Sequence, residues 1–286
     1  MKIGIVGNGF VGSAVSYGFS EQCQVHDSEI RIYDKNPKLS THTLSETLES
    51  DFIFVSVPTP SNSDGSINLD IIYSLFKVMN RLNKRDDNVI LLRSTVVPGT
   101  SYNLQREFTN LNIVFNPEFL TQASAKFDFI NQSRCVLGGD KVWVKKVTEL
   151  FKWRFGDSFP VIETDWETAE MIKYMNNTFF ATKVSFMNEM YQIAKNSGVD
   201  WKTAVDGFVR DGRVGHSHLN VPGPDGSLGF GGVCFPKDIQ AMIHFAESVS
   251  VEPNVLKGAW DTNLDVRPEE DWKQFKGRSV VEEKSQ

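Results

Sequence analysis

The segment GFGGVCFPKD places a lone cysteine, Cys234, directly after a run that is rich in glycine. Lys237 and Asp238 follow within four residues. A buried structural cysteine needs no such approach, whereas a nucleophile that a bulky substrate must reach does. A cysteine attacks as its thiolate, and a nearby ammonium group lowers the pKa of the thiol and stabilises a developing oxyanion. We therefore predict a nucleophile at Cys234, with Asp238 accepting a proton, holding a water or capping the next helix.

Lys173 and Asn177 lie four residues apart in a stretch that reads as helix. Residues at this spacing share one face, so a cation and an amide would project together. Such pairs are commonly solvated, but the presence of Cys234 favours a chemical role. Glu118, in the segment NPEFL, follows a predicted strand and is a candidate general base.

The segment GNGFVG closes the first predicted strand and opens a helix. In that context Gly7 permits a tight turn, Gly9 lets the backbone approach a pyrophosphate, and Gly12 allows close helix–strand packing. Asp34, at the end of the second strand, would accept hydrogen bonds from the ribose hydroxyls and repel a 2′-phosphate. The pattern predicts NAD rather than NADP; a plain glycine turn with a helix-capping aspartate is the alternative.

The elements that position these residues alternate between strand and helix in the first half of the chain. Apolar runs rich in β-branched residues indicate strands that are buried on both faces of a parallel sheet. These runs are Lys2–Gly7, Ile30–Asp34, Phe52–Val57, Asn88–Leu92 and Asn112–Phe115, and an amphipathic helix is expected across Leu69–Leu82. The fold class predicted is α/β, a Rossmann-like doubly wound parallel sheet followed by a helical domain.

Hydroxyl groups follow two of these strands, in the segments SVPTP and RSTVVPGT. Ligands of open α/β sheets gather at the carboxyl ends of the strands. Thr59, Ser94 and Thr95 are therefore expected to face the cofactor or an ordered water. Turn and helix-cap chemistry explains the same hydroxyls equally well.

One long helix is predicted across Asp165–Asn196, because that stretch contains neither proline nor glycine and is followed by Gly198. A glycine- and proline-rich loop, Asn220–Gly232, precedes a helix from about Asp238. The predicted domains are residues 1–163, which bind NAD, residues 164–262, a central helical domain with the cysteine loop, and a polar tail, residues 263–286. A helix of that length usually joins subdomains or packs against a partner chain, and a homodimer through it is expected.

Composition excludes several classes of protein. The net charge of −6 gives no reason to expect nucleic acid or an anionic membrane as partner. The three cysteines have no metal-ligand spacing and indicate a reducing compartment, which favours a cytoplasmic protein without a metal site. No stretch approaches the roughly 20 apolar residues of a membrane span.

The motifs GNGFVG, VPTP, STVVPG, NPEFL, AEMIKYMNNTFFATKVSFMNE and GFGGVCFPKD occur in the order found in the UDP-glucose/GDP-mannose dehydrogenases. The chain resembles this family from Met1 to about Met242, and within it the branch that oxidises UDP-glucose. The resemblance implies a four-electron oxidation of a nucleotide-sugar by NAD. Cys234 would add to an aldehyde as a thiohemiacetal, whose oxidation gives a thioester that water hydrolyses to the uronate, UDP-glucuronate in that branch.

The resemblance also implies roles for individual residues. Lys173 and Asn177 would stabilise oxyanions, and Glu118 would be the base for hydrolysis. Thr95 and Asp238 would hold the water. The implied cofactor site is Gly7, Gly9, Phe10, Val11, Gly12, Asp34, Lys38, Val57, Pro58, Thr59, Thr95 and Lys237. The implied sugar site is Glu118, Phe119, Leu120, Lys173, Asn177, Gly229, Phe230 and Gly231.

The sequence departs from the family pattern in three places. Gln122 stands where many members have a second glutamate, and Leu39 stands where they have a basic residue, with Lys38 one position short. The family has a third domain, which binds the nucleotide. That domain is expected to be missing here, because only the segment FKGRSVV resembles its first strand.

Two alternatives to an active nucleotide-sugar dehydrogenase remain. The first is a protein that is not active by itself, either a non-catalytic NAD-binding module or a subunit that depends on a full-length relative. The second is a different dehydrogenase. A two-electron hydroxyacid dehydrogenase would share the glycine fingerprint and the lysine–asparagine pair, but it has no use for GFGGVCFPKD.

Overall fold

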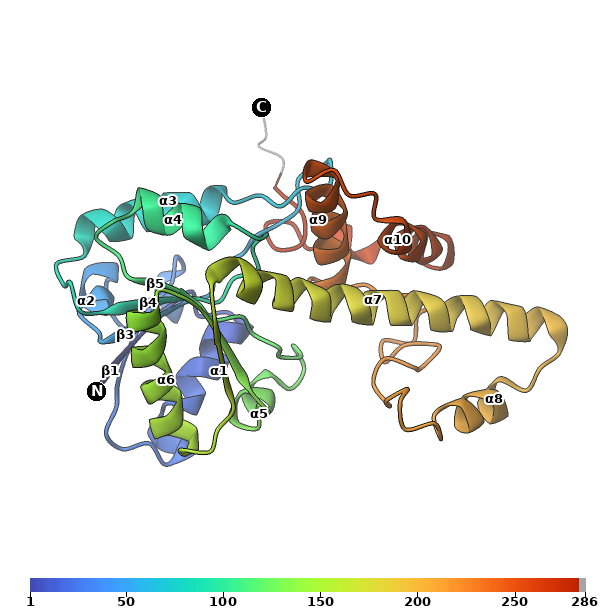
Figure 1. Cartoon of the computed structure of the whole chain (residues 1–286), viewed down its shortest axis with the longest axis horizontal. Helices are drawn as coiled ribbons and strands as arrows, with labels where there is room; N and C mark the ends of the chain where they lie inside the picture. The colour runs from blue at the N-terminus through green and yellow to red at the C-terminus, as the bar shows by residue number, and fades with distance from the viewer. Residues whose placement is uncertain (283–286) are drawn as a thin grey trace. The chain divides into compact units, whose positions relative to one another are not determined.

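The computed structural model describes residues 1–282, which form two compact units (Figure 1). Unit 1 comprises Met1–Thr59 and Leu69–Lys173. Unit 2 comprises Pro60–Asn68 and the chain from Tyr174 onward. Unit 1 ends inside the long helix rather than before it.

A seven-stranded sheet forms the centre of unit 1. Its strands are β1 (Lys2–Val6), β2 (Glu29–Tyr33), β3 (Phe52–Val55), β4 (Val89–Leu92), β5 (Ile113–Phe115), β6 (Cys135–Gly139) and β7 (Val161–Thr164). Their order is β2-β1-β3-β4-β5-β6-β7, and every neighbouring pair is parallel except β5 and β6. The five predicted strands and the Rossmann-like α/β class are confirmed.

Helices cover both faces of this sheet, as Figure 1 shows. They are α1 (Phe10–Gly18), α2 (Leu44–Leu48), α3 (Asp70–Leu82), α4 (Thr100–Glu107), α5 (Ala125–Ile130) and α6 (Lys141–Phe155), with short 3-10 turns η1 (Glu21–Cys23) and η2 (Pro37–Leu39). Alternate strand residues point to opposite faces. Ile3, Ile5 and Phe54 therefore pack with α1, α5 and α6, whereas Ile53 and Val55 pack with α2, α3 and α4.

Strands β6 and β7 were not predicted from the sequence. The run CVLGG in β6 ends in two glycines, which are typical of a turn. Gly138 is nevertheless required there, because a Cβ at that position would lie 2.5 Å from the carbonyl oxygen of Asp165. β7 is an edge strand with exposed residues, so it lacks an apolar run. A β6 that runs antiparallel to β5 departs from a purely parallel sheet.

The predicted long helix is confirmed as α7 (Trp166–Ser197), which contains 32 residues. Its first turns belong to unit 1, where Ala169 is buried in the core beside Trp166. Gly198 has φ +72°, and Val199 N–H donates to the carbonyl oxygen of Ala194, so a left-handed glycine ends the helix as expected. Among the helices of residues 1–282, α7 included, none is long and apolar enough to cross a membrane.

Unit 2 contains the rest of α7 together with α8 (Trp201–Phe208), α9 (Phe235–Ser248), α10 (Asn254–Val266) and the turn η3 (Asp271–Gln274). Ala181, Phe230, Ile239 and Ala259 form its small core. The helix expected from about Asp238 is confirmed as α9, but it begins three residues earlier, at Phe235, with Cys234 as its N-cap residue. Proline at the second helical position permits this early start.

The stretch predicted as a polar tail contains buried residues. Trp272 is 2% exposed, and its ring centroid lies 5.3 Å from that of Trp260. Ser61 N–H donates to the carbonyl oxygen of Ser279, and Val281 N–H donates to that of Ser61. Residues 267–282 are therefore built into unit 2, while positions 283–286 of the predicted tail lie outside the described residues.

The first turn of α4 is capped by Glu170, which reaches it from α7. Glu170 is fully buried, and its two carboxylate oxygens accept hydrogen bonds from the backbone N–H groups of Gly99, at 2.7 Å, and Ser101, at 2.8 Å. Burial raises the pKa of Glu170 to about 7. Unit 1 therefore uses a carboxyl group of α7 to satisfy the donors of another helix.

We predict that this carboxyl group makes stability fall as pH rises from about 4.5 to 7. In that window the folded protein keeps the proton and the unfolded chain has lost it, so the unfolded state binds fewer protons. Glu170→Gln should remove up to about 1.4 kcal/mol per pH unit from this slope. Urea unfolding across that pH range measures it, and the exposed Glu149→Gln variant is the control. A slope unchanged in Glu170→Gln would contradict the assignment.

Candidate functional site

The glycine fingerprint forms the turn between β1 and α1. Gly7 has φ +89°, and a Cβ on Gly12 would lie 1.9 Å from the carbonyl oxygen of Gly7, so neither position tolerates a side chain. A Cβ on Gly9 would instead meet nothing within 4 Å. Because Gly9 is the N-cap residue of α1, the open space lies at a helix N-terminus, where backbone N–H groups bind phosphate. The turn fits the pyrophosphate of a dinucleotide.

Asp34 follows β2 and is joined to the same turn. Its Oδ2 accepts a hydrogen bond from Asn8 N–H at 2.7 Å, and its Oδ1 accepts one from Asn36 N–H at 2.8 Å. A carboxylate has about four lone-pair positions, so each oxygen retains capacity for a ribose hydroxyl. The carboxylate is therefore fixed beside the glycine turn, as the NAD prediction requires. Phe10 and Val11 begin α1, and Lys38 is exposed in η2.

The hydroxyl groups after β3 and β4 join the two loops to each other. Thr59 Oγ1 donates to the carbonyl oxygen of Thr95 at 2.9 Å. Ser94 Oγ donates to the carbonyl oxygen of Val57 at 2.7 Å and accepts from its N–H at 3.0 Å. These bonds connect the loop after β3 to the loop after β4, and cofactor contacts at Val57, Pro58, Thr59, Ser94 and Thr95 stay predictions.

Glu118 and Lys173 form a buried ion pair in unit 1. Their side chains are 8% and 4% exposed, and Lys173 Nζ lies 3.2 Å from Glu118 Oε1. The ammonium also donates to the carbonyl oxygen of Glu118, and Glu118 Oε2 accepts from Leu120 N–H at 2.7 Å. Lys173 is therefore not a solvated surface residue. It holds the NPEFL segment at the carboxyl end of β5.

Arg93 is a second buried cation at this edge, and no role was predicted for it from the sequence. It is 2% exposed and donates through Nη1 to Asn116 Oδ1, in the same NPEFL segment. Burial lowers the pKa of Arg93 to about 10, an effect that the negative charge of Glu118 opposes. Among the described residues its Nε has no hydrogen-bond partner. The sequence signal that could have identified Arg93 is its position directly after a buried strand, β4.

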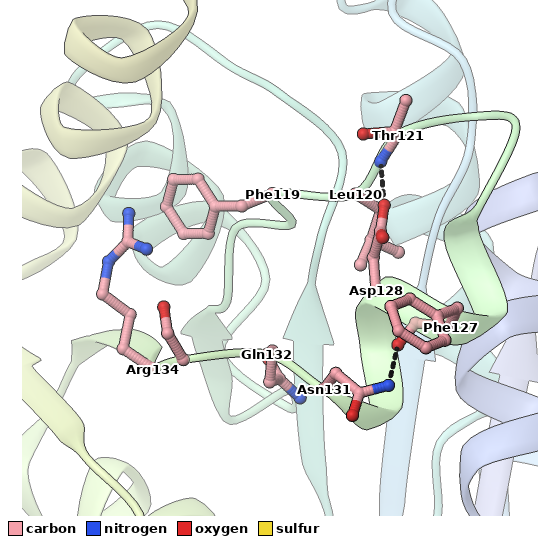
Figure 2. Close-up of a pocket in the computed structure, with 9 residues that line it drawn as sticks. Phe119, Leu120, Thr121, Phe127, Asp128, Asn131, Gln132 and Arg134 are labelled. Carbon is pink, nitrogen blue, oxygen red and sulfur yellow. Dashed lines mark hydrogen bonds between the residues drawn. The ribbon is translucent and has the colours of Figure 1, made fainter. Parts of the chain in front are cut away.

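A pocket of about 330 Å³ lies beside the NPEFL segment, at the lower end of the range for small-molecule sites. Figure 2 shows its lining, which comes from the segment after Glu118, from α5 and from the turn that follows it. Arg134 covers the ring of Phe119, with 4.3 Å between the guanidinium carbon and the ring centroid. Phe119 and Leu120, both predicted sugar-site residues, line this pocket, and Arg134 was missed.

In unit 2, Asn177, Lys237 and Asp238 form a buried polar cluster. Asn177 Nδ2 donates to Asp238 Oδ2 at 2.6 Å, and Lys237 Nζ donates to Asp238 Oδ1. All three residues are at most 7% exposed. Asp238 therefore does not cap α9, and Asn177 is not a surface residue. Lys237, predicted to reach the cofactor, contacts this carboxylate.

Cys234 lies one turn before Asp238 on the same element. As the N-cap residue of α9, it accepts Asp238 N–H through its carbonyl oxygen at 2.9 Å. Its thiol is not in a disulfide and is partly exposed, unlike that of the buried Cys135. The structure thus brings together two predicted groups: Glu118 with Lys173 in unit 1, and Asn177, Asp238 and Lys237 beside Cys234 in unit 2.

Comparison with known families agrees with this arrangement. Residues 29–153 match the NAD binding domain of the UDP-glucose/GDP-mannose dehydrogenase family, and residues 167–265 match its central domain. The chain belongs to this family. It therefore carries the NAD-binding domain of dehydrogenases that use NAD, and the predicted resemblance and cofactor are confirmed.

Two relatives illustrate the match. UDP-glucose 6-dehydrogenase AglM from Haloferax volcanii is 32% identical, over 94% of this chain and 70% of its own length. UDP-glucose 6-dehydrogenase YwqF from Bacillus subtilis is 35% identical, over 75% of this chain and 49% of its own length. The chain thus spans about half to 70% of these two relatives.

Solved structures extend the comparison to shape. A UDP-glucose dehydrogenase from Pyrobaculum islandicum superposes with a TM-score of 0.78 at 27% identity, covering 92% of this chain and 67% of that one. A 3-hydroxyisobutyrate dehydrogenase from Mycobacterium tuberculosis gives a TM-score of 0.74 at 14% identity, covering 94% of each chain. The second likeness concerns the fold alone.

We predict that Asp238→Ala lowers the free energy of unfolding by about 3 kcal/mol. The substitution leaves the buried ammonium group of Lys237 without its carboxylate partner. Adding Lys237→Met to that variant should restore at least about 1 kcal/mol, because the uncompensated charge is then gone. Urea denaturation of the two single variants and the double variant gives both values. Asp265→Ala, at an exposed position on α10, is the control. A double variant as unstable as the sum of the singles would refute the coupling.

Proposed function

We propose that this protein is an NAD-dependent nucleotide-sugar dehydrogenase that oxidises the C6 alcohol of UDP-glucose to the carboxylate of UDP-glucuronate. The observation that carries the proposal is the buried cluster of Asn177, Lys237 and Asp238 beside the N-cap position of Cys234. A two-electron alcohol dehydrogenase has no need of a cysteine there. The choice of UDP-glucose rests on the names of the relatives AglM and YwqF.

Cys234 supplies the nucleophile that makes a four-electron oxidation possible. Its Sγ adds to the aldehyde carbon and gives a thiohemiacetal; loss of hydride from that carbon then gives a thioester, and water releases the carboxylate and the free thiol. When bound, NAD accepts one hydride in each of the two oxidation steps. The N-terminus of α9 favours negative charge at this position, which suits an attacking thiolate.

The buried polar side chains would assist these steps. Lys173 and Asn177 lie one turn apart on α7 and would stabilise the oxyanions that form at C6. Glu118 would take the proton from the attacking water, with Thr95 and Asp238 orienting that water. The burial of Glu118 and Lys173 supports these roles, because charges removed from water act strongly on a developing charge.

The site predicts that wild-type protein forms two NADH for each UDP-glucose consumed. Cys234→Ala should lose at least about 100-fold in the formation of UDP-glucuronate, because no thioester forms. NAD affinity, measured by calorimetry, should stay unchanged, since Cys234 does not belong to the glycine turn.

The control for this experiment is Cys23→Ala, which removes a partly exposed thiol from unit 1. Full activity in Cys234→Ala would exclude the mechanism. NAD binding without turnover of any nucleotide-sugar by wild type would instead favour a non-catalytic NAD-binding module.

We also propose a homodimer through α7, because this helix presents an apolar stripe. The exposed residues are Met175, Phe179, Phe186, Met190 and Ile193, which are between 38% and 63% exposed. At 100° per residue they fall within about 60° of one another around the helix axis. A second copy of the chain would bury this stripe symmetrically.

The dimer proposal predicts a mass of twice 32.3 kDa by light scattering at micromolar concentration. The double variant Phe179→Glu/Phe186→Glu should be monomeric, because it places charge within the stripe. Lys195→Glu, on the opposite side of α7 and exposed, should remain dimeric. A monomeric wild type would rule the proposal out.

A further inference from the structure

The loop before Cys234 is held by side chains rather than by strand pairing. Residues 220–232 contain five glycines and two prolines, so their conformation is costly to fix. The N–H of Gly229 donates to Asn188 Oδ1 on α7 at 3.0 Å. Asn188 is oriented for this by its own Nδ2, which donates to the carbonyl oxygen of Val184 at 2.9 Å. The loop thus has a fixed anchor on a rigid helix.

A second anchor is Asn263 on α10, which binds both backbone groups of Phe230. Its Oδ1 accepts the N–H of Phe230 at 2.7 Å, and its Nδ2 donates to the carbonyl oxygen of Phe230 at 3.0 Å. Asn263 is fully buried. The side-chain amide therefore takes the place of a neighbouring strand, four residues before Cys234.

Arg267 connects two positions within the loop, Asp225 and Leu228, to Asp271 at the start of η3. Its Nη2 contacts Asp225 Oδ2 at 2.7 Å and its Nε contacts Asp271 Oδ1 at 2.7 Å. Nη1 donates to the carbonyl oxygen of Leu228 at 3.2 Å. The arginine side chain is 5% exposed, and its hydrogen bonds to both carboxylates hold the pKa of the guanidinium above its usual value despite burial.

Two glycines of the GFGG run make room for these anchors. A Cβ on Gly229 would lie 2.4 Å from Asn263 Oδ1, and one on Gly231 would lie 2.5 Å from Arg267 Nη2. A Cβ on Gly232 would meet nothing within 4 Å. The approach of the clamping side chains is therefore a reason for glycine at 229 and 231 that does not involve substrate.

Cys234 lies between the anchored loop and the rigid helix α9. Phe230 is 4% exposed and packs against Phe235 and Trp260, with 6.2 Å between ring centroids in each case. Trp260 in turn packs against Trp272 of η3. The position of the Cys234 thiol thus depends on contacts that α10 and the segment after it supply.

We infer that Asn263, Arg267 and Asp271 form a clamp that positions the Cys234 loop for attack. These are positioning residues for the chemistry, and they belong to the segment that the sequence presented as a polar tail. The catalytic part of this inference rests on the proposed function, whereas the clamp itself does not. Loss of the guanidinium releases Leu228 and Asp225 and leaves Asp271 without its cation.

The experiment compares wild type with Arg267→Met, Arg267→Lys and the control Arg278→Met, which removes an exposed guanidinium from the same segment. Hydrogen exchange of the peptide that spans residues 228–234 should be at least tenfold faster in Arg267→Met, with peptides of unit 1 unchanged. Alkylation of Cys234 by iodoacetamide should be at least fivefold faster in that variant, measured against Cys23 in the same sample. Arg267→Lys should recover part of both changes.

Turnover provides the third readout. In Arg267→Met, kcat with UDP-glucose should fall at least tenfold while the KM for NAD stays unchanged, because the glycine turn at Gly7 is untouched. Wild-type rates of exchange and alkylation in Arg267→Met would overturn the clamp. Altered rates with an unchanged kcat would overturn its catalytic role. If wild type does not turn over UDP-glucose, the proposed function fails, and exchange and alkylation still decide the clamp.

Discussion

The carboxyl edge of the unit 1 sheet is governed by one constraint, the free-energy cost of removing charged side chains from water. Arg93 and Lys173 are both buried there, and one carboxylate, that of Glu118, lies close enough to influence both. A buried ion pair contributes little to stability, because desolvation offsets the attraction. An apolar core would have been as stable at this position. The excess of positive charge instead suits an anion that forms during a reaction.

Side chains that replace backbone partners recur across the fold. Glu170 satisfies the first turn of α4, and Asn263 pairs with Phe230 as a strand would. Each lies on a helix and serves a segment that lacks regular pairing. Buried backbone N–H and C=O groups must be satisfied, and loops that carry function have fewest partners of their own. The helices α7 and α10 thus hold a neighbouring helix end and a loop in place rather than acting as packing elements alone.

Features of the fold that have a local signal in the sequence were predicted correctly. The turn at the glycine fingerprint, the position of Asp34 directly after β2, five strands and the length of α7 all followed from spacing and composition. Features whose cause is a distant contact were missed. Strand β6 was not predicted, because the reason for glycine at position 138 is the close approach of the distant Asp165 backbone. Of the roles considered for Asp238, the helix cap is wrong, and nothing local revealed the bond of its carboxylate to Asn177. Arg93 had only its position directly after a buried strand as a signal, and Arg267 carried no pattern, since their partners lie on other elements.

The insertion Pro60–Asn68 makes neither unit a continuous stretch of chain. The chain leaves unit 1 after β3 and re-enters it before α3. The residues between these two points belong to unit 2. Ser61 in this insertion pairs with Ser279 and Val281, at the far end of the described chain. During synthesis the sheet of unit 1 can form early, but this insertion finds these partners only after residues 279–281 have been made. Unit 2 is therefore completed by a segment that is synthesised well before the rest of that unit.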